Sequence, residues 1–231
     1  YKRQVSYTLL IMLSSYSVCR AMVMPASFLV VLFYAIYLVV RNGVISYQKA
    51  SGLAMFSGIV IFCFYSFIRL KEMLPVEEYG YDAIFFILLI LCFAWGGDTC
   101  AYFAGRAFGK HKLCPVVSPK KTVEGAIGGV LGTMVFGVLV TVIYSIAADR
   151  MEEFTRSNIG VSMYVIIALL ACVAAVLGIY GDLFASVVKR QCGIKDYGTI
   201  FPGHGGILDR FDSVMFIAPF VTMVVIAAFY N

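Results

Sequence analysis

Residues 157–181, SNIGVSMYVIIALLACVAAVLGIYG, contain no Asp, Glu, Lys or Arg. A helix needs roughly 20 consecutive apolar residues to cross the hydrocarbon core of a bilayer. A spanning segment must also satisfy its backbone hydrogen bonds internally, because lipid offers no partners, and a helix does so. This stretch therefore predicts a transmembrane helix.

The rest of the chain has the same character. Hydrophobic residues make up 61% of it and charged residues 13%, against roughly 45–50% and about 25% in soluble domains. We therefore predict an all-α polytopic membrane protein with about seven transmembrane helices. Besides 157–181, uncharged stretches cover residues 4–19, 21–40, 50–68, 83–97, 125–148 and 213–231.

We expect two parts, N-terminal membrane helices over residues 1–81 and a second membrane domain over 82–231 that carries the polar motifs. The chain begins at Tyr1 rather than Met, so we also allow for further spans upstream. No secretory pattern of a charged n-region, an apolar h-region and a small-residue cleavage site precedes residue 20, so the start is not interpreted as a signal peptide.

The Lys and Arg residues are distributed unevenly between the two faces that alternating spans would create. One face receives 13 of the 18 Lys and Arg residues and the other receives five. By the positive-inside rule the richer face is cytoplasmic. Its basic residues are Lys2, Arg3, Arg41, Lys49, Arg106, Lys110, Lys112, Lys120, Lys121, Lys189, Arg190, Lys195 and Arg210.

Two carboxylates, Asp98 and Asp182, follow glycines at the ends of apolar stretches. A charge at membrane depth costs about 2.5–3.5 kcal/mol on insertion scales, so it usually has a partner or a function. Both lie in the pattern Gly-Asp-x-x-Ala, although a position in interfacial water would explain either one alone. Helical spacing predicts two aligned groups, namely Asp98 with Tyr102 and Arg106, and Asp182 with Ser186 and Lys189 or Arg190.

A second acidic pair, Asp209 and Asp212, is expected at the start of the last hydrophobic helix, where residues three apart are neighbours. Such close carboxylates repel unless a cation lies between them. Oxygen ligands favour Mg²⁺, whereas the seven scattered Cys and two His predict no zinc-type site. Favourable interaction with a helix dipole is the alternative explanation.

Two polar segments carry the basic residues that a phosphate ligand needs. One spans residues 186–206, where the glycines permit close backbone approach to an anion. Lys189, Arg190, Lys195 and Arg210 lie in it or close to it, and His204 is assigned to phosphate because of these neighbours. The other is Ser118-Pro119-Lys120-Lys121-Thr122, in which Ser118 is expected to be an N-cap and Pro119 the first helical residue of the next span.

The run Ser186-x2-Lys189-Arg190-x4-Lys195-Asp196-x-Gly198-x2-Phe201-Pro202-x-His204-Gly205-Gly206-x2-Asp209-Arg210-x-Asp212 resembles the signature of the phosphatidate cytidylyltransferase (CDP-diacylglycerol synthase) family. Residues 95–106 and 118–125 are similar to that family as well, so the resemblance covers most of residues 95–212. Residues 1–94 match only as generic membrane helices.

This resemblance implies a multi-pass enzyme, often a homodimer, that condenses CTP with phosphatidic acid to give CDP-diacylglycerol and pyrophosphate. It implies Mg²⁺ and a second, monovalent cation such as K⁺, with Asp182, Asp209 and Asp212 as metal ligands. We expect these three and Lys189 to be catalytic. The expected substrate-binding residues are Asp98, Ser118, Lys120, Lys121, Thr122, Ser186, Arg190, Lys195, His204 and Arg210.

Two other functions use a similar set of residues. A CTP-dependent lipid kinase would transfer the γ-phosphoryl group instead, and an ion-coupled transporter would use the intramembrane Asp residues as an ion path. The crowding of Gly, His, Lys and Asp into one interfacial segment argues against a transporter. We expect an enzyme of a bacterial cytoplasmic membrane, with its active site facing the cytoplasm and no nucleic-acid partner.

Overall fold

The computed structural model describes residues 47–150, 160–198, 206 and 208–229, together with a few positions between 32 and 40. The predicted span 4–19 and most of 21–40 lie outside the described residues. The chain forms two units, Tyr1–Ser57 and Gly58–Asn231, and every contact given below lies within the second. The predicted division at residue 82, which follows the motifs, stays a prediction.

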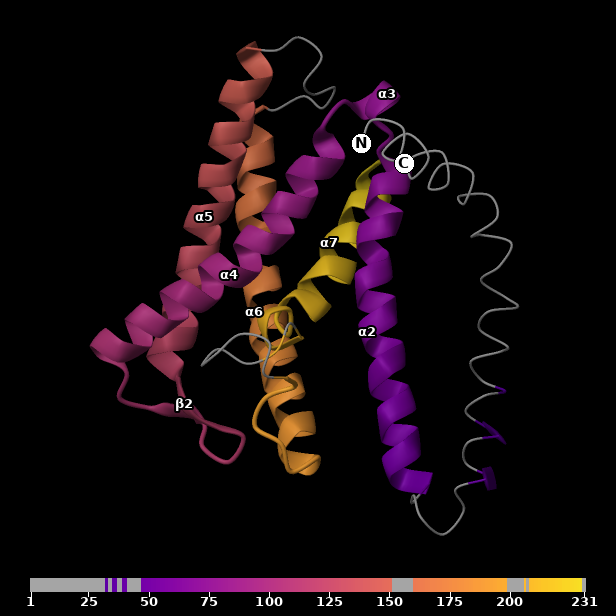
Figure 1. Cartoon of the computed structure of the whole chain (residues 1–231). Coiled ribbons are helices and arrows are strands. Elements are labelled where there is room, and N and C mark those ends of the chain that lie inside the picture. The colour runs from indigo at the N-terminus through magenta and orange to yellow at the C-terminus, as the bar shows by residue number, and fades with distance from the viewer. Residues whose placement is uncertain are drawn as a thin grey trace, which may run out of the picture. The chain divides into compact units, whose positions relative to one another are not determined.

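The described part is mostly helical (Figure 1). Four helices contain stretches that are long and apolar enough to span a membrane: Ala54–Met73, Asp82–Phe108, Val123–Ala148 and Val161–Gln191. The predicted stretch 213–231 corresponds to a shorter helix. The helices are α2 (Tyr47–Met73), α3 (Val76–Tyr79), α4 (Asp82–Phe108), α5 (Val123–Arg150), α6 (Val161–Gln191) and α7 (Val214–Phe229).

Helix ends follow from local sequence. Helix α2 stops at Met73, two residues before Pro75, because a proline disfavours helical geometry in the residue that precedes it. Helix α6 carries Lys189 and Arg190 in its last turn, where positive charge complements the helix dipole. Gly193 follows with a φ of 69°, the left-handed conformation that glycine adopts at little cost.

The segment expected to open the fifth span is a β-hairpin instead. Strand β1 (Lys112–Cys114) pairs antiparallel with β2 (Ser118–Thr122), and α5 begins only at Val123. The prediction of Ser118 as N-cap and Pro119 as first helical residue was therefore wrong. Thr122 performs the capping, since its Oγ1 accepts a hydrogen bond from the Gly125 N–H at 3.1 Å.

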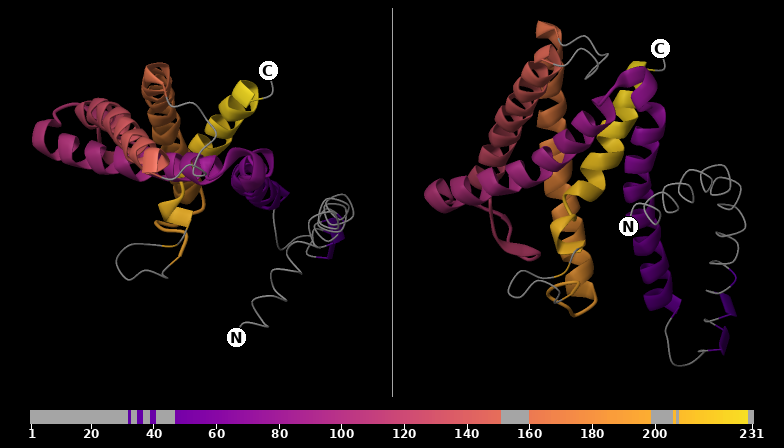
Figure 2. Two further views of the ribbon diagram at one scale, coloured as in Figure 1. Left: turned by 90° about the horizontal axis from the view of Figure 1, so that it is seen from above. Right: turned by 45° about the horizontal axis from the view of Figure 1, so that its top comes forward.

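Helices α4 and α5 pack closely through small residues (Figure 2). A Cβ built on Gly128 would lie 2.2 Å from the Ala104 Cβ, and one on Gly132 would lie 2.3 Å from the Cys100 Cβ. Lipid gives little hydrophobic drive for helices to associate, so close backbone approach and dispersion contacts hold such pairs together. The glycines of α5 are therefore required for this contact.

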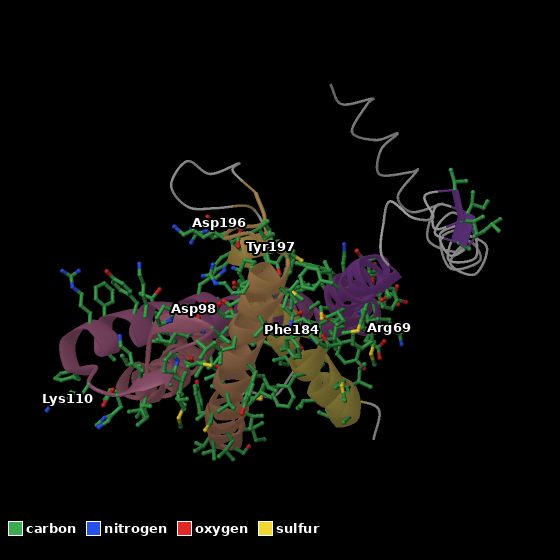
Figure 3. The ribbon with its side chains drawn as sticks, turned by 90° about the horizontal axis from the view of Figure 1, so that it is seen from below. Arg69, Asp98, Lys110, Phe184, Asp196 and Tyr197 are labelled. Carbon is green, nitrogen blue, oxygen red and sulfur yellow. The ribbon has the colours of Figure 1, made fainter. Side chains whose placement is uncertain are left out.

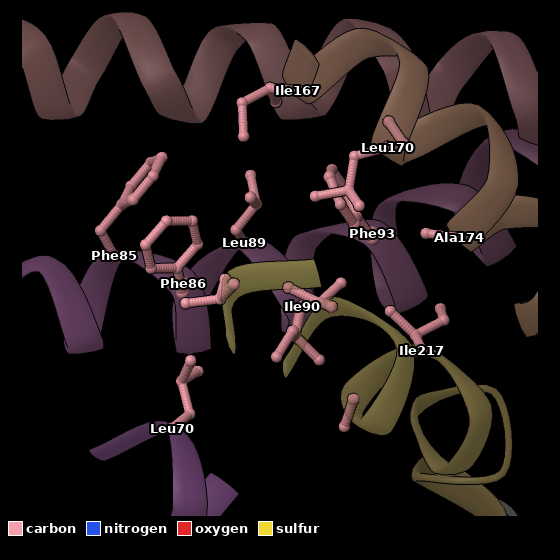
Figure 4. Close-up of a cluster of buried hydrophobic side chains, with 14 of the residues drawn as sticks. Leu70, Phe85, Phe86, Leu89, Ile90, Phe93, Ile167, Leu170, Ala174 and Ile217 are labelled. Atoms are coloured by element: carbon pink, nitrogen blue, oxygen red, sulfur yellow. The ribbon is translucent and has the colours of Figure 1, made fainter. Parts of the chain in front are cut away.

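A cluster of apolar side chains joins α4, α6 and α7 (Figure 4). Leu89, Ile90 and Phe93 of α4 are almost fully buried, together with Ile167 of α6 and Ile217 of α7. Near the start of α4 the Tyr144 hydroxyl donates to Asp82 Oδ1 at 2.7 Å, so this buried carboxylate is hydrogen-bonded. These contacts fix the helices that carry the polar residues described next.

We predict that Gly128→Leu weakens the α4–α5 contact and destabilises the folded protein by at least about 1–3 kcal/mol, the usual cost of overpacking. The measurement is the unfolding midpoint in detergent. Gly58→Leu is the matched control, because a Cβ at Gly58 meets nothing within 4 Å. Equal midpoints for the two variants would show that the close contact is not needed for stability.

Candidate active site

Three carboxylates from distant parts of the sequence converge. Asp98 lies on α4, Asp182 on α6, and Asp212 in the turn that leads into α7. All three line one cavity of about 490 Å³, which Lys120 and Lys121 of the hairpin also line. Seen from below in Figure 3, Asp98 lies close to α6, whereas Lys110 lies at the far end of the α4–α5 pair.

Glycines make this convergence possible. A Cβ on Gly97 would lie 2.5 Å from the Thr133 Oγ1, and one on Gly181 would lie 2.6 Å from the Asp212 carbonyl oxygen. Each glycine therefore lets a neighbouring element approach the residue just before a carboxylate. This gives a physical reason for the repeated Gly-Asp pattern.

The sequence predicted that Asp209 and Asp212 lie at the start of the last helix, but both precede it. Asp209 belongs to a 3₁₀ turn, Leu208–Arg210, and α7 begins only at Val214. The two carboxylates have different surroundings as a result, and each has its own hydrogen-bond partners.

The Asp212 carboxylate lies in a strongly negative setting. Burial and the charge of Asp182 raise the pKa of Asp212 to about 7, Asp98 adds to this rise, and Lys189 opposes it. A positive charge placed among the three carboxylates would relieve this repulsion. Hard oxygen donors of this kind fit Mg²⁺.

Lysine side chains supply part of that positive charge. The Lys121 Nζ lies 2.5 Å from Asp182 Oδ2. The Lys189 Nζ lies 2.9 Å from Asp209 Oδ1 and 4.0 Å from Asp212 Oδ2. Lys121 of the hairpin therefore pairs with a carboxylate of α6, and Lys189 of α6 pairs with carboxylates that precede α7.

Asp209 anchors the segment from Tyr197 to Gly206, called the glycine-rich segment below. Its Oδ2 accepts hydrogen bonds from the Tyr197 and Gly206 backbone N–H groups, both at 2.8 Å, while Oδ1 accepts from Lys189. Burial alone would raise the pKa of Asp209, but these three hydrogen bonds bring the pKa below its ordinary value. The Tyr197 hydroxyl also donates to the Ala185 carbonyl at 3.0 Å. Asp209 thus ties both ends of this segment to α6.

The hairpin is held at its base by Glu124. One Glu124 oxygen accepts from the Lys110 N–H at 3.0 Å, and the His111 Nδ1 lies 2.6 Å from the other. Sequence reasoning had left Glu124 without an assigned role. Its carboxylate closes the link between α4 and α5, from which Lys120 and Lys121 project.

A second cavity, of about 660 Å³, shares Asp98, Asp209 and Asp212 with the first. Its other lining residues include Trp95, Thr99, Arg210 and Phe211. The Trp95 indole N–H donates to the Arg210 carbonyl at 3.0 Å, and the Trp95 ring meets the Phe211 ring edge to face. Trp95, the only tryptophan of the chain, opens the stretch 95–106 that resembles the family, but sequence analysis assigned it no role.

Some of the remaining predicted site residues lie beside the carboxylates, and others are exposed or lie outside the described residues. The Ser186 hydroxyl lies 3.4 Å from Asp182 Oδ1, and the Arg106 guanidinium lies 3.4 Å from the Tyr102 hydroxyl, so one pair within each predicted group is in contact. Lys189, which was predicted to align with Asp182, pairs with Asp209 instead. Ser118 and Thr122 lie on β2, whereas Arg190 and Lys195 are exposed at and beyond the end of α6. His204 lies outside the described residues.

The three predicted metal ligands are near one another without forming a ready-made site. Among the residues that the structure describes, no group of three or more His, Cys, Asp or Glu side chains has the spacing of a metal site. The assignment of Asp182, Asp209 and Asp212 to a metal therefore stays a prediction. Asp98, which the sequence analysis assigned only to substrate binding, lines the same cavity as these three carboxylates.

The chain is similar in sequence to known proteins. A model of the Cytidylyltransferase family matches residues 2–228. A phosphatidate cytidylyltransferase of Bacillus subtilis is 32% identical over 198 residues, which cover 86% of this chain and 66% of that protein. Relatives with the same name from Staphylococcus haemolyticus and Staphylococcus epidermidis are 39% and 42% identical over 145 residues, which cover 63% of this chain and 50% of each relative.

The matched regions thus span about half to two thirds of the length of these curated relatives. The family match, by contrast, extends over nearly all of this chain and includes every carboxylate and lysine of the two cavities. The chain belongs to the cytidylyltransferase family.

Proposed function

We propose that this chain transfers the cytidylyl group of CTP to phosphatidic acid, which gives CDP-diacylglycerol and pyrophosphate. The observation that carries this proposal is the convergence of Asp98, Asp182 and Asp212 with Lys120 and Lys121 around one cavity. The names of the relatives support the same reaction.

The reaction needs no protein nucleophile. An oxygen of the lipid phosphate attacks the α-phosphorus of CTP, a new P–O bond forms, and the bond between the α-phosphorus and its bridging oxygen breaks to release pyrophosphate. Phosphoryl-type transfers of this kind depend mainly on positioning and on neutralising charge. Lys120, Lys121 and Arg106 line the cavity where a triphosphate would need that neutralisation.

The two cavities offer a separate binding site for each substrate. In-line displacement requires the attacking oxygen and the leaving group to lie on opposite sides of the phosphorus. We assign CTP to the cavity with the hairpin lysines, and the lipid phosphate to the cavity with Trp95, Phe211 and Arg210. The carboxylates shared by both cavities would lie beside the reacting phosphorus.

A divalent cation fits this donor set, because burial and the charges of Asp182 and Asp98 raise the pKa of Asp212, and a cation bound there would favour its ionised form. Asp182, Asp209 and Asp212 are the proposed ligands, with Asp98 as a further carboxylate beside them. Mg²⁺ would supply neutralisation of the phosphate charge that builds up during transfer. The monovalent cation and the homodimer implied by the family remain proposals.

We further propose that the enzyme lies in a bacterial cytoplasmic membrane with the cavities facing the cytoplasm. The bacterial relatives and the excess of Lys and Arg on one predicted face support this. Acyl chains would then stay in the bilayer while CTP arrives from water.

Labelled CTP decides which bond is broken. The α-phosphorus label should enter chloroform-soluble lipid, and the γ label should leave as pyrophosphate, when full-length enzyme is given phosphatidic acid. Recovery of the γ label in lipid, with CDP released, would instead establish the lipid kinase.

The carboxylates should be required individually. Asp182→Asn, Asp209→Asn and Asp212→Asn should each lower kcat by about two orders of magnitude or more, since each removes a proposed ligand of the cation that would neutralise the phosphate charge. Steady-state rates at saturating Mg²⁺, with detergent-extracted protein of normal unfolding midpoint, provide the measurement. Glu77→Gln, a charge removal on α3, is the control and should keep the wild-type rate. A variant with near wild-type kcat would show that its carboxylate is not a ligand.

A further inference from the structure

Lys121 is the counter-ion of a carboxylate that the proposed reaction needs for a metal. Its Nζ lies 2.5 Å from Asp182 Oδ2, and each side chain is 25% exposed. Both residues line the cavity that also holds Asp98 and Asp212. A divalent cation that binds Asp182 must therefore displace the ammonium group of Lys121 or share the carboxylate with it.

The backbone on either side of Lys121 is held in place by neighbouring contacts. The neighbouring Thr122 is buried and caps α5, and Glu124 holds the start of the hairpin through the Lys110 N–H. A lysine has a flexible four-carbon stem with a compact charge at its end. Lys121 can therefore exchange one anionic partner for another without movement of the hairpin.

Lys189 makes a similar ion pair but is not suited to such an exchange. Its side chain is only 10% exposed, contacts Asp209 at 2.9 Å, and lies with its Nζ 5.3 Å from the centre of the Tyr197 ring. It is enclosed by the groups that anchor the glycine-rich segment. The more exposed Lys121 faces the cavity in which a triphosphate would lie.

The cost of moving Lys121 depends on what else is in the cavity. Lys120 and Arg106 line it as well, so an ammonium group released from Asp182 would enter a basic environment. Like charges that share a cavity of low dielectric constant repel one another. A phosphate anion in the cavity would turn that repulsion into attraction.

We propose that Lys121 couples metal binding to nucleotide binding, because it releases Asp182 only when a phosphate group accepts its charge. The divalent cation then binds well together with CTP and poorly on its own. This proposal rests on the proposed function, since it takes the triphosphate as the anion that receives Lys121. By linkage, the metal must raise the affinity for CTP by the same factor as CTP raises the affinity for the metal.

Trp95 provides a direct readout of the metal. It is the only tryptophan, and it lines a cavity together with Asp98 and Asp212. Terbium, a cation that prefers hard oxygen ligands, emits when bound close to an excited tryptophan, and Mg²⁺ affinity follows from competition. The terbium emission that is lost in Trp95→Phe is the part that comes from this site.

The test compares Lys121→Gln with wild type, with and without CTP, and without lipid so that no turnover occurs. In the wild type, CTP should raise the metal affinity about tenfold or more. Lys121→Gln should bind the metal alone about tenfold more tightly than wild type and should lose most of the gain from CTP. Lys121→Arg, which keeps the charge, should restore weak binding of the metal alone. Lys120→Gln, the neighbouring control, should leave the affinity for the metal alone closer to wild type.

Wild-type metal affinity in Lys121→Gln, in a protein with an unchanged unfolding midpoint, would overturn the coupling. If the wild-type enzyme still passes the α label of CTP into lipid, the proposed function survives that result. If CTP leaves the metal affinity unchanged and its α label does not enter lipid, the proposed function and the coupling are both wrong.

Discussion

Close backbone contact at two glycines is the constraint on which the site depends. Gly97 admits Thr133 of α5, and Gly181 admits the backbone of Asp212 beside α6. A side chain at either position would separate the elements, and the carboxylates that follow these glycines would move apart with them. Membrane helices associate through close packing rather than through burial from water, so small residues determine which surfaces meet. In this chain the same glycines hold the fold together and assemble the chemistry.

The charges brought together in this way must be compensated. Uncompensated carboxylates near a low-dielectric interior are costly, and the structure meets that cost with lysines from two other segments. The two lysines differ in their freedom. Lys189 is enclosed and ties Asp209 to α6, while Lys121 is more exposed and lines a cavity. One set of ion pairs thus stabilises the site, and the other is placed where a substrate phosphate can compete for it.

The membrane helices and most of the candidate site residues could be predicted from the sequence, whereas the hairpin and some contacts within the site could not. Hydropathy predicted the helices that became α4, α5 and α6, because lipid leaves a charge-free stretch of this length few alternatives. It did not reveal the hairpin at Ser118, since Ser-Pro is also typical of a helix start and strand pairing is not a local property. The motif gave Asp182, Asp209 and Asp212, but only the packing showed that Asp98 joins them. Trp95 opens the stretch 95–106 that resembles the family, but nothing in its sequence position reveals its contact with Arg210, which lies 115 residues further along the chain.

We propose a direct transfer at phosphorus between two substrates that approach a shared carboxylate cluster from separate cavities. Its most direct test is the stereochemical course with CTP made chiral at the α-phosphorus by sulfur substitution. One in-line displacement inverts that centre, so the CDP-diacylglycerol analogue should have the inverted configuration. Retention would require two successive displacements through a covalent cytidylyl-enzyme, and would rule out direct transfer.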